Sequence, residues 1–503
     1  MILSQKSSLK GIIRTVLTIS LLISASLWAA EPGTEVDNYG RAITVDQDGN
    51  VYISGYHSGV TYFGDVMLDC GRNKAIFLSK LDTNGNWLWT KEFPGIGIDE
   101  GRNLTIDSKG NLYFTGWFEN ETVFDEHKLI SRGSKDAFIA KLDQDGNIIW
   151  IRQAGSTGDD RGVDVDVTDD GLVYLAGWFG GKVKFGDDEI SAYGGQDMYV
   201  AALDEDGNWL WANNPGGIDM DIPLGISVDN EGNCLVCGRF TDNYYFVDYD
   251  TKLEKHDTLE DRKRKIKELK GYGTTDMILF KIGPDGNYKW FLNAGGVSED
   301  VGRSVHVDSD DNCYFTGWFS DMARFGPFEF QSKGDRDIFV AKVDKDGEWQ
   351  WVTVAGAQVM DAAIGIKAVP SGHVYITGNF GRTVKFGDET LEADQFEDVF
   401  VSKLDFDGNW IWTRSISNVI RGSGITVATD DDENCYIVGY AGFRMFNKDI
   451  NSYWDAVNED ILVAKIDKDG VWQWVRRAGC IKDEDAKEVI GNPLLTPNFN
   501  PQK

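Results

Sequence analysis

Short stretches of alternating hydrophobic and polar residues recur along the chain in pairs. In the first pair, Ile43 and Val45 flank Thr44, the polar segment DQDGN follows, and VYISG returns from Val51. Alternation with a period of two is typical of a β-strand, and an Asp–Gly segment between two such stretches favours a tight turn. The pattern therefore predicts a β-hairpin, and a second hairpin, AIFLSKLD-TNGN-WLWTKEF, follows it from Ala75.

The two hairpins recur together seven times, and this repetition predicts the fold. The first half reads GRAITVDQDGNVYISGY from Gly40 and GRNLTIDSKGNLYFTGW from Gly101, and the second half reads DAFIAKLDQDGNIIW from Asp136. Seven repeats of four antiparallel strands predict an all-β chain, a seven-bladed β-propeller of four-stranded antiparallel blades. The predicted blades span residues 40–100, 101–160, 161–221, 222–300, 301–361, 362–420 and 421–485.

The elements DxxGNxYxxG and DxFxAKxDxxG…W resemble the bacterial β-propeller repeat called the SBBP repeat, over residues 40–485. The resemblance implies a propeller in an exported bacterial protein, and it carries over no catalytic residues. The chain also resembles, more distantly, the quinoprotein propeller repeat, which places Trp after an acidic turn that contains Gly. The WxW pairs of this chain, such as Trp472 and Trp474, recur so regularly that we expect them to pack between blades.

The first 30 residues predict a secretory signal peptide. Lys6, Lys10 and Arg14 precede an apolar stretch at 16–27, and small residues end the segment at Ala30. This stretch is shorter than the roughly 20 residues of a bilayer span. We therefore expect a secreted, periplasmic or cell-surface protein with no transmembrane anchor in the mature chain. Residues 31–485 would form the propeller and residues 486–503 a flexible tail.

The charge of the chain narrows the class of partner. Lys and Arg number 50 and Asp and Glu 81, so the formal net charge is −31. A polyanion of this kind is repelled by nucleic acid, so the expected partner is a protein or a glycan at the cell surface.

Metal and cofactor chemistry has little support in the sequence. The DxDGN turns look like calcium loops, but they lack the longer loop and distal Glu of an EF-hand, so we expect hairpin turns with at most weak calcium binding. Cys234 and Cys237 fall three residues apart on one predicted strand and so on opposite faces. No cofactor is predicted, and any metal site is left undefined.

Aspartates recur at two equivalent positions in most of the repeats. One column precedes the first strand of a repeat: Asp99, Asp160, Asp221, Asp300 and Asp361. The other opens the third strand: Asp136, Asp197, Asp276, Asp337, Asp398 and Asp460. We expect inter-blade ion pairs and caps on backbone amides, because buried charges need partners. The alternative is a ring of cation sites.

Candidate ligand-binding residues lie where the repeats differ. Most members of one polar column on the innermost strand are Thr or Ser, as at Thr44 and Thr426, whereas three are titratable: Asp166, His306 and Lys367. A second position on that strand holds Arg41, Arg102 and Arg303. Together these six residues could line one mouth of the central channel and bind a small polar or anionic ligand. The alternative is that they bond neighbouring blades or water.

The fourth repeat contains an insertion between its second and third strands. Residues 252–270 hold eight Lys or Arg and five Asp or Glu, with Thr258 placed to cap a helix. We predict a surface helix that is either solvated or docked against a partner. The candidate docking residues are Leu259, Arg262, Ile266 and Leu269.

Cys70 and Cys480 suggest a disulfide that would close the ring. Cys70 falls between the second and third strands of the first repeat, and Cys480 follows the last strand of the seventh. Since a closed ring places these repeats side by side, a Cys70–Cys480 bond would join them, contributing about 4–5 kcal/mol in the chain-entropy model.

The leading functional hypothesis is an exported, non-enzymatic β-propeller that binds a protein or glycan through its loop-bearing face. One alternative is an extracellular lyase or hydrolase with its site at the channel mouth. Another is a purely structural surface module. The absence of GxSxG and HExxH motifs gives an enzyme little support.

Overall fold

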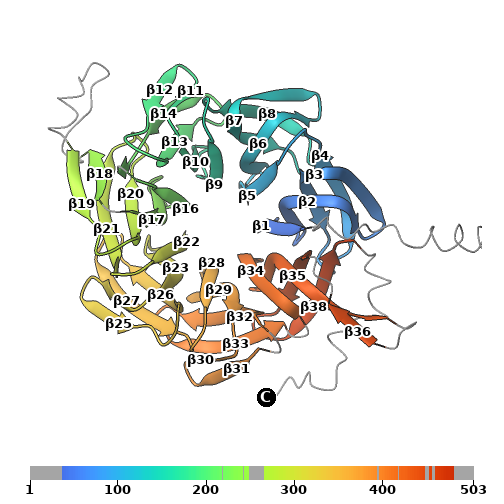
Figure 1. Ribbon diagram of the computed structural model, residues 1–503, viewed down its shortest axis with the longest axis vertical. Helices are drawn as coiled ribbons and strands as arrows, with labels where there is room; N and C mark the ends of the chain where they lie inside the picture. Colours follow the sequence, from blue (N-terminus) through green and yellow to red (C-terminus); the bar gives the residue numbers. More distant parts are fainter. Residues whose placement is uncertain are drawn as a thin grey trace, which may run out of the picture. The chain divides into compact units, whose positions relative to one another are not determined.

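The computed structural model describes residues 37–480, apart from 218, 242, 248–265, 394–395, 417–418, 448–451 and 456–458. The predicted signal peptide, the predicted tail and two insertion residues, Leu259 and Arg262, lie outside the described residues. The described part is all β, with seven four-stranded antiparallel blades that follow one another round a ring (Figure 1). Among the described residues there is no helix with the length and hydrophobicity of a membrane span.

Each blade takes its four strands from one continuous part of the chain. In order from the axis outward, these strands are β1 (Tyr39–Val45), β2 (Val51–Phe63), β3 (Val66–Leu81) and β4 (Trp87–Phe93); β5 (Glu100–Ile106), β6 (Leu112–Phe124), β7 (His127–Leu142) and β8 (Ile148–Ala154); β9 (Arg161–Val167), β10 (Val173–Phe179), β13 (Asp197–Leu203) and β14 (Trp209–Asn213); β16 (Ile222–Val228), β17 (Cys234–Phe240), β20 (Asp276–Ile282) and β21 (Tyr288–Gly296); β22 (Val301–Val307), β23 (Cys313–Phe319), β26 (Asp337–Val343) and β27 (Trp349–Ala355); β28 (Ala362–Val369), β29 (His373–Phe380), β32 (Asp398–Asp405) and β33 (Trp410–Ile416); β34 (Val419–Thr429), β35 (Cys435–Asn447), β37 (Asp460–Ile466) and β38 (Trp472–Ala478).

An additional hairpin extends from each blade between its second and third strands, and we call it the outer hairpin. In blades one and two it is the far end of β2–β3 and β6–β7; in blade seven it joins the end of β35 to β36 (Ser452–Asp455). The other outer hairpins are β11 (Lys182–Phe185) with β12 (Asp188–Ser191), β18 (Asn243–Val247) with β19 (Ile266–Lys270), β24 (Met322–Phe325) with β25 (Phe328–Gln331), and β30 (Thr383–Phe386) with β31 (Glu389–Glu392).

The outer hairpins reach back to the preceding blade. Thr122 pairs with Gly95 and Lys385 pairs with Gly356, each at the end of the preceding blade's outermost strand. In blade four, β18 pairs with the short strand β15 (Gly216–Gly217). The same contact closes the ring, because Tyr62 of blade one exchanges two backbone hydrogen bonds with Gly479 after blade seven.

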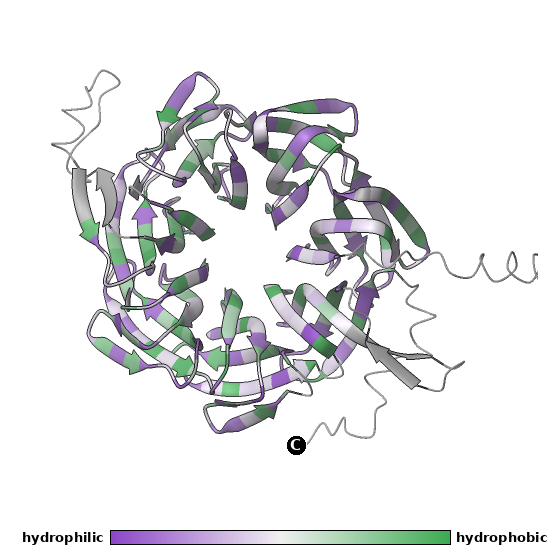
Figure 2. Cartoon of the chain, viewed as in Figure 1, coloured by the Kyte–Doolittle hydropathy of each residue, from purple (hydrophilic) through white to green (hydrophobic). Residues whose placement is uncertain are grey.

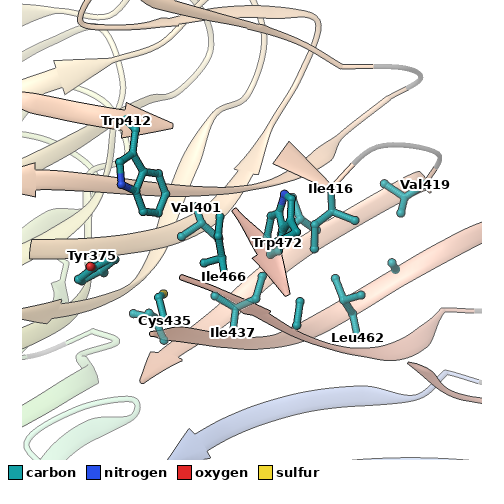
Figure 3. Close-up of a cluster of buried hydrophobic side chains, with 14 of the residues drawn as sticks. Tyr375, Val401, Trp412, Ile416, Val419, Cys435, Ile437, Leu462, Ile466 and Trp472 are labelled. Carbon is teal, nitrogen blue, oxygen red and sulfur yellow. The ribbon is translucent and has the colours of Figure 1, made fainter. Parts of the chain in front are cut away.

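Hydrophobic side chains fill the spaces between neighbouring blades. One such cluster joins blades six and seven, and it includes Tyr375, Val401, Trp412, Cys435 and Leu462 (Figure 3). Because every blade has a neighbour on both faces, middle strands such as β10 and β13 are buried along their whole length, and hydrophobic residues occur in all seven blades (Figure 2). The predicted inter-blade role of the WxW tryptophans is confirmed at the second residue of a pair: Trp412 donates its indole N–H to the Lys468 carbonyl of the next blade at 3.0 Å.

Two local predictions differ from the structure. The far end of the predicted insertion helix, Ile266–Lys270, is strand β19, paired with β18, because its residues continue the outer hairpin of blade four. In blade seven, Ala428 lies opposite Tyr436, as Thr44 lies opposite Tyr52 in blade one. Ala428 therefore occupies the position of the polar column in blade seven, and Thr426 lies two residues before it. Strand β34 also has an additional bulge near its start, which the other innermost strands lack.

Candidate functional site

Three arginines lie on the innermost strands at one end of the ring. Arg41, Arg102 and Arg303 come from β1, β5 and β22, each next to a glycine that faces the invariant repeat glycine of the second strand. This is the end at which the second strand leaves for the outer hairpin. We call these three residues the axial arginine cluster, and they share a face of the propeller with the outer hairpins and the connections between blades.

Aromatic rings support the axial arginine cluster. The Cζ atom of Arg41 lies 4.9 Å from the ring centre of Tyr39, that of Arg102 lies 5.2 Å from Trp117, and that of Arg303 lies 5.9 Å from Trp318. The guanidinium groups are thus held by cation–π contacts, which leave their N–H groups for other acceptors.

The cluster carries little compensating negative charge. Arg41 has a distant ion pair with Glu100 at 4.0 Å, and in the described part of the chain no carboxylate lies within that distance of Arg102 or Arg303. Burial, together with the charges of Arg41 and Arg303 and against the opposing charge of Glu100, lowers the pKa of Arg102 to about 9. Burial, followed by the charge of Arg41, lowers the pKa of Arg303 to about 10. An anion placed here would relieve this mutual repulsion.

Asp166, His306 and Lys367 occupy a different level of the innermost strands. Each lies three or more positions beyond the arginine position, so about 10 Å separates the two levels at 3.3 Å per residue. The structure therefore does not bring the six predicted residues into one site. Among the described residues no hydrogen bond joins any two of Asp166, His306 and Lys367.

The Asp166 carboxylate bonds a neighbouring blade, as the structural alternative expected. Its Oδ2 accepts the Val228 amide of blade four at 3.0 Å, and its Oδ1 accepts the Val167 amide at 2.9 Å. In blade four, Ser227 accepts the Val307 amide of blade five in the same way. These bonds leave Asp166 poorly suited to acid–base catalysis.

His306 and Lys367 are held towards their neutral forms. Burial and then the charge of Lys367 lower the pKa of His306 well below its usual range, and its buried Nδ1 has no hydrogen-bond partner. Burial lowers the pKa of Lys367, while the charge of Asp166 opposes that shift. The Nδ1 atom of His306 is therefore a buried polar atom that can still form a hydrogen bond.

The insertion and cysteine predictions have separate outcomes. Leu269 of β19 packs against the hydrophobic cluster between blades three and four, so it faces inward.

Tyr62 of β2 pairs with Met67 of β3 on one side and with Gly479 on the other. Since neighbouring strands lie about 4.8 Å apart, Cys70 in β3 and Cys480 are separated by β2. The structure does not form the predicted Cys70–Cys480 disulfide, which needs Cα atoms within about 7 Å.

The aspartate columns cap backbone amides at the blade junctions. Asp300 accepts the Gly296 amide at 2.6 Å and the Ser320 amide at 3.0 Å, as the prediction of backbone caps expected. Of the predicted aspartates, Asp460 forms an ion pair with Arg477 of its own blade at 3.3 Å. An ion pair between blades uses a carboxylate of a first turn instead, in the 3.2 Å contact of Lys403 with Glu433. Burial raises the pKa of Asp300 to about 7 and that of Asp221 to about 8.

One cluster of reactive side chains was not predicted from the sequence. His57, Cys70 and Glu92 of blade one place a ring nitrogen, the sulfur and a carboxylate oxygen within 4.8 Å of one another. Burial raises the pKa of the Cys70 thiol to about 11. The available signal was the unusual residue types at repeat positions that hold Phe118, Ser131 and Gln153 in blade two.

Comparison with known proteins supports the fold at a coarse level. No model of a protein family matches the chain. A curated relative is the uncharacterized WD repeat-containing protein L264 of Acanthamoeba polyphaga mimivirus, 20% identical over 429 residues, which cover 71% of this chain and 30% of that protein. The chain therefore spans less than a third of that relative's length.

Two solved structures match this chain at low identity. The WD40 domain of Neurospora crassa Pan2 has 8% identity and a TM-score of 0.37, covering 75% of this chain and 88% of its own. The puromycin hydrolase S511A mutant complexed with PGG has 10% identity and a TM-score of 0.45, covering 89% and 54%. At these values neither structure supports a statement about activity. The chain is a seven-bladed β-propeller, and its resemblance to the SBBP repeat stays a prediction.

Proposed function

We propose that this propeller is an exported, non-enzymatic binding module that recognises an anionic group of a protein or glycan partner on its loop-bearing face. The observation that carries the proposal is the axial arginine cluster. Three arginines converge near the axis of a chain whose net charge is −31, and two of them lack a nearby carboxylate. Planar guanidinium groups are well suited to bind carboxylate, sulfate or phosphate oxygens with paired hydrogen bonds.

The position of the cluster suits a surface partner. Arg41 and Arg303 each have a buried Nε without a hydrogen-bond partner, so donors remain for an incoming anion. A partner's acidic group at the axis would place the rest of that partner over the outer hairpins. Secretion, or a location in the periplasm or at the cell surface, rests on the predicted signal peptide.

The test is a binding measurement with two defined polyanions, poly-glutamate and polygalacturonate, on the purified protein. We expect saturable binding of at least one polymer, reduced tenfold or more by Arg102→Gln and by Arg303→Gln. The matched control is Lys109→Gln, which removes one exposed positive charge from the turn at the opposite end of β5.

The two polymers distinguish the classes of partner. Preference for poly-glutamate would support a protein partner, and preference for polygalacturonate a glycan. Equal loss in all three variants would show a general charge effect and contradict the proposal. A further variant without residues 252–265 tests whether the insertion of blade four contributes to capture.

A further inference from the structure

Blade one differs from its siblings at three positions that meet in space. At the position of His57, five other blades hold phenylalanine: Phe118, Phe179, Phe240, Phe319 and Phe380. Cys70 takes the place of Ser131, and Glu92 that of Gln153. Blade one also has Ala75 where blade two has Asp136, so the usual junction carboxylate is missing here. Three coordinated differences at one site indicate a role that the repeat itself does not require.

The histidine is oriented by a carboxylate. The fully buried His57 ring places Nε2 3.0 Å from Oε1 of Glu92, and a carboxylate oxygen accepts hydrogen bonds. The ring proton therefore belongs on Nε2, and Nδ1 presents its lone pair towards Cys70. A carboxylate bonded to the far nitrogen of a histidine is the usual support of a metal-binding imidazole.

The sulfur lies in an electron-rich environment. Cys70 Sγ is 3.8 Å from His57 Nδ1, and three carbonyl oxygens surround it: Asn73 at 3.2 Å, His57 at 3.4 Å and Gly59 at 3.8 Å. A single thiol proton cannot satisfy four acceptors. These oxygens would also oppose a bare thiolate, so the surroundings favour a cation over a nucleophilic cysteine.

The spacing of the two donor atoms fits a tetrahedral metal. Bonds of about 2.3 Å to sulfur and about 2.1 Å to nitrogen place those atoms about 3.6 Å apart at the ideal tetrahedral angle of about 109°, and about 3.8 Å apart at about 120°. Cys70 Sγ and His57 Nδ1 are 3.8 Å apart. Thiolate and imidazole together favour zinc or copper over magnesium and calcium, and zinc binds without redox chemistry.

We propose that Cys70 and His57 of blade one bind a zinc ion, with Glu92 as the positioning residue that holds the imidazole. On binding, the S–H bond breaks, a sulfur–zinc bond forms, and the proton passes to solvent. No electron transfer is involved. The site lies within the outer hairpin of blade one, close to the contact of Tyr62 with Gly479, so the ion would stiffen the hairpin that closes the ring.

Cobalt(II) is the probe, because a thiolate–cobalt bond absorbs in the near ultraviolet. The purified, chelator-treated protein should bind one equivalent of Co²⁺ with this absorption, and Zn²⁺ should displace it. Each variant takes the residue of blade two: Cys70→Ser should abolish the band, His57→Phe should weaken binding at least tenfold, and Glu92→Gln should weaken it about 10- to 100-fold. Cys480→Ser, which alters the other partly exposed thiol, should change neither band nor affinity.

A second readout does not depend on how the variants fold. In the wild-type protein, Zn²⁺ should slow alkylation of Cys70 by iodoacetamide at least tenfold, as followed by peptide mass spectrometry. The proposal is overturned if one equivalent of Co²⁺ gives no charge-transfer band, if the band survives Cys70→Ser, or if Zn²⁺ leaves alkylation unchanged. Rapid alkylation of the metal-free protein that is lost in His57→Phe, without any metal effect, would identify a nucleophilic cysteine instead and also overturn it.

Discussion

The indole of Trp474 in the last blade lies over Gly85 in the first, and its N–H donates to the Thr83 carbonyl at 3.0 Å. The same contact joins Trp150 to the turn that contains Gly207 in the next blade. In the described residues the bond that joins the two ends of the ring therefore recurs at other junctions between blades, for example from Trp412 to the Lys468 carbonyl. The turn glycine has a positive φ and no side chain, and both properties let the indole ring lie close to the turn.

Replacing that glycine should weaken the closure. Gly85 has φ 77°, and a Cβ there would lie 2.8 Å from Cδ2 of Trp474. We expect Gly85→Ala to destabilise the protein by about 2–5 kcal/mol, from the left-handed conformation and from overpacking together. Gly181→Ala is the matched control, since Gly181 has φ 91° with nothing within 4 Å of its Cβ. Urea denaturation should show a larger loss for Gly85→Ala, and equal losses would contradict the role of the indole contact.

The buried junction carboxylates should make stability depend on pH. Burial raises the pKa of Asp221 to about 8, whereas an unfolded aspartate titrates near 3.9. Between these values the folded chain keeps a proton that the unfolded chain releases, so stability falls as pH rises through this window. Below it the contribution is complete, and above it the folded protein must bury a charge.

Asp221→Asn tests this dependence, because an amide cannot ionise. Relative to wild type, we expect the variant to gain about 1–3 kcal/mol between pH 5 and pH 8.5, read from urea denaturation at both values. Asp206→Asn, at an exposed turn, removes the same formal charge and should leave the pH profile unchanged. Parallel profiles for wild type and Asp221→Asn would show that the Asp221 proton is not retained on folding.

Sulfate should stabilise the folded protein through the axial arginine cluster. At a concentration ten times its Kd, a ligand that binds only the folded state contributes about 1.4 kcal/mol. We expect sodium sulfate to raise the Tm of wild type more than that of Arg102→Gln, compared with sodium chloride at equal ionic strength. Because sulfate also stabilises proteins generally, only the difference between the two proteins is informative. An identical rise in both would count against anion binding at Arg102.

Cys234 should be replaceable by valine. It is buried in the cluster between blades three and four, whereas Cys237 lies in the cluster between blades four and five, so they face opposite sides of β17. Val51 and Val173 occupy the position of Cys234 in other blades. We expect Cys234→Val to change stability by less than about 1.5 kcal/mol, measured by thermal denaturation. Loss of bound metal in this variant would contradict the packing role.

Much of the fold follows from the sequence because its pattern is local and repeated. The alternation around Thr44 and the turn at Gly49 predict one hairpin, and seven copies predict seven blades. The outer hairpins were missed, although xVxFG segments such as that of Phe386 and Gly387 mark them. The reason is physical: β30 and β31 are four residues each and are held by the Phe386 side chain on Trp410, which is a contact between distant parts of the repeat.

The candidate site was predictable only in part. The arginine position was correct because Arg41, Arg102 and Arg303 share one register with the repeat glycine. Their separation from His306 along the axis depends on strand geometry, which residue types do not reveal. His57 and Glu92 are far apart in sequence, and only the pairing of β2, β3 and β4 brings them to Cys70.

The outer hairpins reach back to the preceding blade, and the tryptophans reach forward to the next one. In the described residues these two kinds of contact join most neighbouring blades, and both occur between blades seven and one. Where the polypeptide starts and stops is then of little importance to cohesion: a chain cut at a turn such as Asp107–Asn111, and joined through its present termini, would retain every coupling. The junction between blades seven and one is therefore expected to contribute to stability about as much as the other junctions.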